Sequence, residues 1–191
     1  MRKGKIILLM FLAILSIGAL SSCGTKETTT KELTFADVLK KVVIGRGEPT
    51  TINKEEFLST RSVTLPSYVT TSITASNTAL KLYFNKTVKV NKVEFDVTFG
   101  DCYHESHKDS FDMEILYGIW KTGLNSDSSL NTINEVYETG KEYHFIIDFT
   151  EIRACETNEN ILIDFSFDRT NMFCHHEAYI TNFDIDFTIV E

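Results

Sequence analysis

Apolar and polar residues alternate along most of the second half of the chain. Apolar side chains occupy every second position over residues 80–85, 93–99, 143–150, 161–167 and 183–189, with mostly polar residues between them. A period of two places successive side chains on opposite faces of a β-strand. Strands of this kind bury one face and expose the other, as antiparallel sheets do. The pattern predicts a mainly β fold, an antiparallel β-sandwich.

Other segments carry the same signal less cleanly. We expect further strands at 112–120 and 132–137, and at 62–65 and 68–74 in a Thr- and Ser-rich stretch. The rows that would face inward are rich in phenylalanine, of which the chain has 14. Each buried Phe contributes roughly 1.5–3 kcal/mol, so the core is adequate for independent folding.

A different period precedes the strands. Thr34 is a suitable N-cap, with Asp37 as its acidic partner, and Gly45 is a suitable C-terminal stop. The apolar residues between them have helical spacing: Phe35, Val38, Leu39, Val42 and Val43. We therefore expect one short N-terminal helix over 34–44, with Lys40 and Lys41 in its last turn.

The first 23 residues read as an export signal. Three cations are followed by an apolar run over 6–17, which is too short for a membrane span of about 20 residues. The run ends in Leu20-Ser21-Ser22-Cys23, which resembles the lipobox of bacterial lipoproteins. The resemblance implies that residues 1–22 are removed and that Cys23 carries acyl chains. The protein would then be anchored in the cell membrane on its extracytoplasmic face.

Charge narrows the possible partners. The chain has a net charge of −8, and loss of residues 1–22, with three cations and no anion, takes it to −11. Such a chain is unsuited to nucleic-acid binding, which needs clustered Lys and Arg. It is also repelled by anionic headgroups, so the lipid would provide the anchoring. The polar residues after Cys23 predict a flexible tether over 23–33.

The closing strands carry a second resemblance. The segments 143–150, 161–167 and 179–189 look similar to the last strands of galactose-binding-like jelly-roll modules, in which the final strand returns through the middle of a sheet. The resemblance covers at most residues 62–191. It implies a jelly-roll-like sandwich that binds sugars and, in some members, a structural calcium. We expect residues 34–61 to form the helix and a connecting segment, and 62–191 the sandwich domain.

Two loops gather most of the histidines and cysteines. One holds Cys102, His104 and His107, and the other holds Cys174, His175 and His176. Strand alternation puts both loops at one end of the sandwich and Cys155 at the other. Three interpretations stay open: a Cys102–Cys174 disulfide, a zinc site of thiolate and imidazole ligands, and unconnected surface residues. The spacing matches no standard zinc motif.

No motif in the sequence favours catalysis. A metal-dependent hydrolase could use the two loops with Glu105 or Glu177 as base, and a Cys–His pair could act as a nucleophile, but only the residue types support either. The chain has no Walker loop, dinucleotide fingerprint or Gly-x-Ser-x-Gly elbow. The segment 125–136 lacks the Gly and Glu of an EF-hand, which leaves calcium binding of another kind open.

Sugar binding needs exposed aromatic rings. Trp120, the only tryptophan, lies near a predicted strand end, and Tyr103 and Tyr83 are the other outward candidates. The alternative for Trp120 is that it closes one end of the core. We therefore expect a lipid-anchored, non-catalytic binding module for a carbohydrate. The alternatives are a zinc-binding lipoprotein or metal-dependent hydrolase built on the two loops, and a structural envelope lipoprotein that binds another protein.

Overall fold

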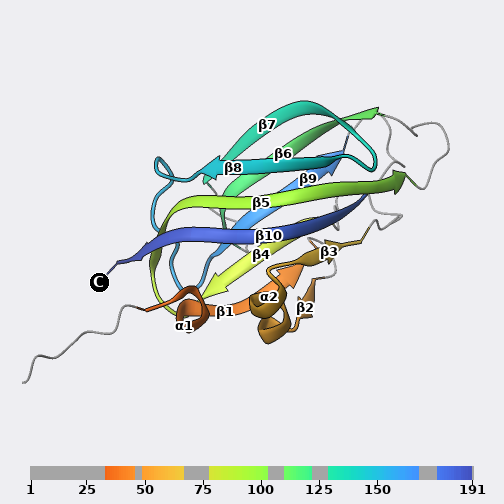
Figure 1. Ribbon diagram of the computed structural model, residues 1–191. Helices are drawn as coiled ribbons and strands as arrows, with labels where there is room; N and C mark the ends of the chain where they lie inside the picture. Colours follow the sequence, from red (N-terminus) through yellow and green to blue (C-terminus); the bar gives the residue numbers. More distant parts are fainter. Residues whose placement is uncertain are drawn as a thin grey trace, which may run out of the picture. The chain divides into compact units, whose positions relative to one another are not determined.

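The protein is a β-sandwich of two antiparallel sheets (Figure 1). The computed structural model describes residues 33–45, 49–66, 78–102, 110–121, 129–167 and 176–190. Residues Leu33–Glu191 form one compact unit. Within the described ranges, no helix is long and apolar enough to cross a membrane. The predicted fold class is confirmed.

The larger sheet has six strands in the order β2-β1-β4-β9-β6-β7. Their bounds are β1 Leu39–Ile44, β2 Thr50–Ile52, β4 Ala79–Phe84, β6 Ser110–Trp120, β7 Ser129–Glu138 and β9 Asn160–Phe167. The predicted strands at 80–85, 112–120, 132–137 and 161–167 all fall in this sheet. The predicted strand at 68–74 lies outside the described residues.

The smaller sheet has four strands in the order β3-β10-β5-β8. Their bounds are β3 Val63–Leu65, β5 Val88–Cys102, β8 Glu142–Asp148 and β10 His176–Ile189. The closing strand β10 therefore runs through the middle of its sheet, between β3 and β5, as expected.

Phenylalanine side chains fill the space between the sheets. Phe95 of β5 is fully buried and lies near rings from both sheets, with centroid distances of 5.4 Å to Phe145, 6.2 Å to Phe165 and 6.2 Å to Phe183. Phe57 of the helix α2 (Lys54–Thr60) is 5.4 Å from Phe183, so this helix closes one side of the same core.

The helix expected over 34–44 is wrong beyond its first turn. Helix α1 spans only Phe35–Val38, and the chain continues directly into β1. The expected start is correct, because the Asp37 carboxylate accepts from the backbone N–H of Thr34 at 2.8 Å. Pairing of β1 with both β2 and β4 outweighs helical spacing in a segment that ends in β-branched residues.

A register shift explains why the helical spacing is misleading. The pairing of β1 with β4 is irregular between Leu39 and Lys41, and such a bulge changes which residues face inward. Leu39 and Val42, three residues apart, are therefore both buried. The segment 34–61, expected to form a helix and a connecting segment, contributes β1 and β2 to the six-stranded sheet.

Candidate functional site

The two loops rich in histidine and cysteine begin at the same end of the sandwich. Strand β5 ends at Cys102 and β10 begins at His176, and these two residues are opposite each other in the register. Cys155 pairs with Val88, the first residue of β5, so it lies at the other end of that strand. The predicted positions of these three residues are confirmed.

His176 is packed inside the protein. Its side chain is fully buried and stacks on Phe111, with 3.9 Å between ring centroids. Its Nδ1 lies 2.7 Å from the carbonyl oxygen of Gly100, and since that oxygen only accepts, Nδ1 carries the proton. Only Nε2 could then bind a metal.

The remaining loop residues lie outside the described part of the chain. They are Tyr103, His104, His107, Cys174, His175 and the side chain of Cys102, and the same holds for Cys23. In the described ranges, no group of three or more His, Cys, Asp and Glu residues could hold a metal ion. The disulfide and the zinc site therefore stay predictions.

Cys155 is a free, fully buried thiol. Burial raises its pKa to about 12, because the thiolate would lose its hydration in this environment. The thiolate is the nucleophilic form of cysteine, so Cys155 is unsuited to nucleophilic catalysis.

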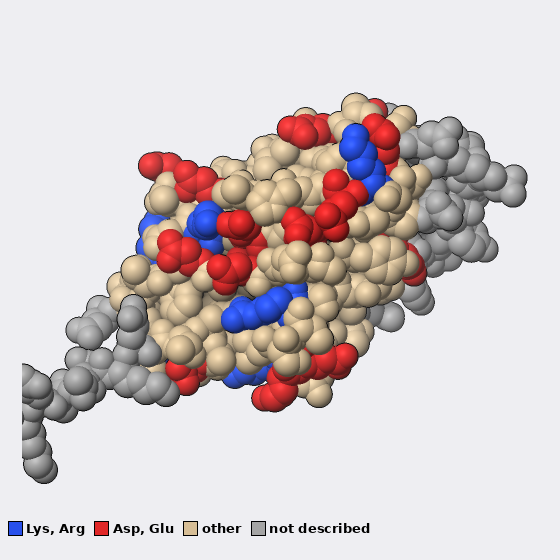
Figure 2. Space-filling view, in the orientation of Figure 1, with Lys and Arg blue, Asp and Glu red and all other residues tan. Residues whose placement is uncertain are grey.

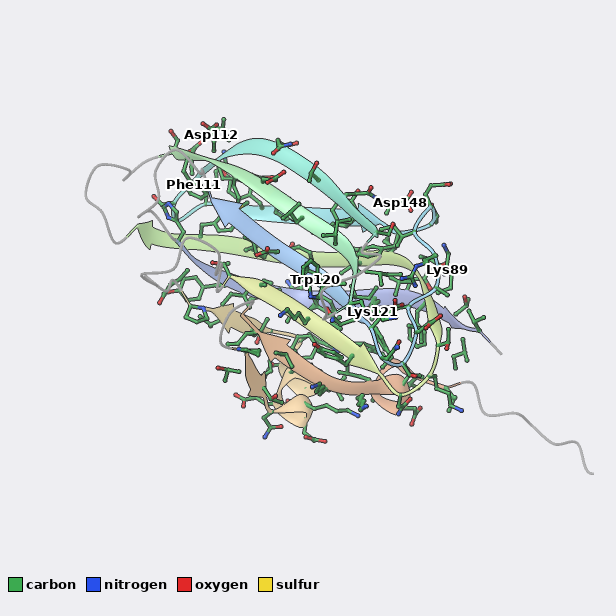
Figure 3. All side chains as sticks on the ribbon, turned by 180° about the vertical axis from the view of Figure 1, so that it is seen from behind. Lys89, Phe111, Asp112, Trp120, Lys121 and Asp148 are labelled. Carbon is green, nitrogen blue, oxygen red and sulfur yellow. The ribbon has the colours of Figure 1, made fainter. Side chains whose placement is uncertain are left out.

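The predicted sugar-binding rings of Tyr83 and Trp120 lie on one surface, the outer face of the six-stranded sheet. Leu82, Phe84 and Ile119 belong to the core between the sheets, and strand alternation turns their neighbours Tyr83 and Trp120 to the outer face. Both rings are half-buried, and neither belongs to the core cluster. Figure 3 shows this side of the molecule, with Trp120 at the end of β6.

Strand β9 lies between the two rings. Trp120 of β6 is opposite Asn160 of β9, and Leu82 of β4 is opposite Ile161, so Asn160 falls between Trp120 and Tyr83. Two strand spacings separate the rings, which is about 10 Å at the usual 4.7–4.9 Å per strand. We call Lys41, Tyr83, Asn160 and Trp120 the ring row.

Asn160 brings a buried polar side chain to the ring row. It is 1% exposed, and its Nδ2 donates to the backbone oxygen of Trp120 at 3.0 Å. Its Oδ1 is buried and accepts no hydrogen bond from the described residues. Leaving a buried acceptor unsatisfied costs about 1–3 kcal/mol.

A lysine accompanies each ring. Lys41 is opposite Tyr83 in the register, and its Nζ lies 4.4 Å from the centroid of the Tyr83 ring. This cation–π contact holds the ammonium at one end of the row. Lys121 is half-buried and directly follows Trp120 at the other end (Figure 3).

An ion pair lies just before the start of β9, next to Asn160. The Glu159 carboxylate, whose side chain is 2% exposed, accepts from both terminal nitrogens of Arg153 at 2.6 and 2.7 Å. It also accepts from the backbone N–H of Glu156 at 3.0 Å. The Arg153 hydrogen bonds hold the pKa of Glu159 below its ordinary value of 4.5, despite the opposing effect of burial.

Glu159→Gln is expected to flatten the acid side of the stability profile. Because the folded-state pKa is lowered, the carboxylate stabilises the fold above the unfolded pKa, and this contribution is lost as pH falls through the folded pKa. We expect the wild type to lose about 1.5–3 kcal/mol more than the variant between pH 6 and acid pH, the range for hydrogen bonds to a charged group. Urea unfolding at a series of pH values measures the difference. Identical pH slopes for the two proteins would contradict the assignment.

The outer face of the four-stranded sheet carries a hydrogen-bonded polar network that the sequence did not predict. Asp96 of β5 accepts from Asn182 at 2.6 Å and lies 2.7 Å from Nδ1 of His144. The His144 ring also lies 3.5 Å from Glu94, which accepts from Lys92 at 2.6 Å. Figure 2 shows this face, where acidic and basic side chains are interspersed.

The network is internally satisfied. The Asn182 and His144 hydrogen bonds lower the pKa of Asp96, and the Lys92 hydrogen bond lowers that of Glu94. Asn182 has a positive φ of 51° at a register shift in β10, a conformation that asparagine tolerates better than most residues. Because each carboxylate already has a donor from the protein, the network is suited to fixing the strands.

Comparisons with known proteins place no constraint on the site. No known family model matches the chain, and no curated protein matches it significantly. The function therefore has to be argued from the ring row and its surroundings.

Proposed function

We propose that this protein is a lipid-anchored, non-catalytic module that binds carbohydrate on the extracytoplasmic face of the cell membrane. The anchor is Cys23, as the resemblance to the lipobox implies, and the tether is the polar segment that follows it. The binding surface is the ring row on the outer face of the six-stranded sheet.

The observation that carries the proposal is the arrangement of Tyr83, Asn160 and Trp120 on three adjacent strands. Binding sites for small molecules combine aromatic side chains with a few placed polar groups. The apolar face of a sugar ring packs on an aromatic ring, and its hydroxyls need acceptors. Trp120 supplies the ring, and beside it lies Asn160, a polar side chain whose buried Oδ1 accepts no hydrogen bond from the described residues.

Trp120→Ala is expected to weaken glycan binding by about tenfold or more, which corresponds to about 1.4 kcal/mol. The loss reflects removal of the ring on which the sugar packs. Affinity electrophoresis through gels that contain soluble polysaccharides measures binding for many glycans at once. Thermal unfolding of each variant establishes that it is folded.

Tyr179→Ala is the matched control. Tyr179 is 40% exposed and lies on the outer face of the four-stranded sheet, so its removal deletes an exposed ring from the opposite side of the sandwich. We expect its binding profile to equal that of the wild type. Equal retention of wild type and Trp120→Ala on every retained glycan would refute the assigned surface. Copurification of one envelope protein, with no glycan retained, would favour the structural alternative.

A further inference from the structure

We propose that the glycan bound at the ring row is anionic, a polysaccharide that carries carboxylate or sulfate groups. This inference rests on the proposed function and adds the chemical class of its ligand. It follows from the charges around the row, which differ in sign from those of the protein as a whole.

The protein is acidic, yet the described side chains at both ends of the ring row are cationic. The net charge of the chain is −8. Lys41 is exposed and is held over Tyr83, and Lys121 follows Trp120. A cationic surface on an acidic protein selects anionic ligands by electrostatic complementarity.

Two carboxylates beside and within strand β9, those of Glu159 and Asp164, are buried. Glu159, next to Asn160, is neutralised by its two hydrogen bonds from Arg153. Asp164 of β9 is fully buried and is opposite Ala79, away from the strand end that carries the rings. The row residues themselves include no carboxylate, so repulsion of an anionic ligand is weak there.

The charged side chains on the opposite face of the sandwich differ from those at the ring row. The outer face of the four-stranded sheet carries Glu94, Asp96, Asp184 and Asp186 together with Lys92. The carboxylates on these strands outnumber Lys92, so this face is less suited to an anionic polymer than the ring row. We therefore expect the same anionic ligand to bind at the ring row and not on the outer face of the four-stranded sheet.

The length of the row indicates a polymer and not a single sugar. Lys41 and Trp120 are three strands apart, on β1 and β6, which is about 14 Å at the usual strand spacing. A ligand that packs on Trp120 and also reaches the Lys41 ammonium must extend beyond one sugar ring.

Paired polymers that differ only in charge test this inference. The full chain is purified in a detergent without a sugar headgroup and titrated with polygalacturonate and with its fully methyl-esterified form. Unsulfated chondroitin and chondroitin sulfate distinguish carboxylate from sulfate, and dextran and galactan are neutral references. Because Trp120 is the only tryptophan, its fluorescence reports binding at the site.

We expect at least one anionic polymer to bind and its neutral counterpart to bind at least about tenfold more weakly. Binding should weaken as NaCl rises from 0.05 to 0.5 M, because salt screens exposed charges. Lys41→Gln and Lys121→Gln should each raise the Kd at least about threefold. Lys141→Gln is the matched control, because its Nζ also lies over a tyrosine ring, 5.4 Å from the Tyr143 centroid, at the β7–β8 turn.

The remaining outcomes distinguish the proposal of an anionic ligand from the proposal of carbohydrate binding. Equal binding of neutral and anionic polymers, still dependent on Trp120, overturns the anionic ligand and leaves the carbohydrate-binding module standing. Unchanged affinity in both lysine variants also overturns the anionic ligand. Absence of binding to every polymer of the panel counts against both proposals.

Discussion

Gly118→Ala is expected to lower the free energy of unfolding by about 2–5 kcal/mol, combining backbone strain with overpacking. Gly118 has a φ of +144°, which side chains other than glycine rarely adopt. A Cβ at this position would lie 2.0 Å from the carbonyl oxygen of Ser129 and 3.1 Å from the Cα of Leu130, both on the adjacent strand β7. These are backbone atoms, so the strands themselves would have to move apart.

Gly140→Ala separates the two causes of this loss. Gly140 also has a positive φ, of +72°, but a Cβ there would meet no atom within 4 Å. We expect it to cost only the backbone term, about 1–2 kcal/mol. Urea unfolding of both variants measures the difference. Equal losses would show that the close approach of β7 to Gly118 contributes nothing.

Gly118→Ala is also expected to affect the binding site. Gly118 and Trp120 are both on the outer face of β6, two residues apart. A shift of β6 against β7 would therefore move Trp120 as well. We expect Gly118→Ala, at temperatures where it is folded, to bind glycan more weakly than Gly140→Ala.

Phe95→Ala is expected to destabilise the protein by about 3–5 kcal/mol, the usual cost of deleting a buried Phe side chain. The Phe95 ring is fully buried and packs against Phe145 and Phe183 of its own sheet and Phe165 of the other. Its removal leaves a cavity between the two sheets, where rings on both sides lose contacts.

The control for this deletion is Ile146→Ala, on the strand next to Phe95. Ile146 is 60% exposed, and we expect its removal to change the free energy of unfolding by less than about 0.5 kcal/mol. Denaturant midpoints at constant m value give both numbers. A loss below about 1 kcal/mol for Phe95→Ala would mean that the two sheets do not depend on this ring for their packing.

The strands could be predicted because their rows of side chains follow a strict period. In β5, for example, Val93, Phe95, Val97 and Phe99 are all buried, and the residues between them are not. This information is local to each strand. The predicted helix over 34–44 was wrong because its outcome depends on pairing with two other strands, β2 and the more distant β4.

Only part of the candidate site could be predicted from the sequence, for the same reason. Trp120 and Tyr83 could be proposed from the sequence, because an outward aromatic residue beside inward apolar ones is a local pattern. Asn160 and Lys41 could not, because their places in the row depend on the register of β9 with β6 and of β1 with β4. The sequence signal for Lys41 even favoured a helix end.

The polar network was missed for a related reason. Alternation alone turns Glu94 and Asp96 outward on β5, and His144 outward on β8. Their contact depends on the pairing of Asp96 with His144 across the two strands. A positive φ at Asn182, which completes the network, has no signature in the sequence beyond the residue type itself.

The central claim is that a carbohydrate binds over Trp120, and the fluorescence of this single tryptophan tests it most directly. A polysaccharide that the wild-type protein retains is added to the full chain, and the emission and its quenching by acrylamide are recorded. The account predicts a saturable change in Trp120 emission and slower quenching by acrylamide. The Kd from this titration should equal the Kd measured by retention. Saturated binding with unchanged emission and unchanged quenching would place the ligand elsewhere and contradict the account.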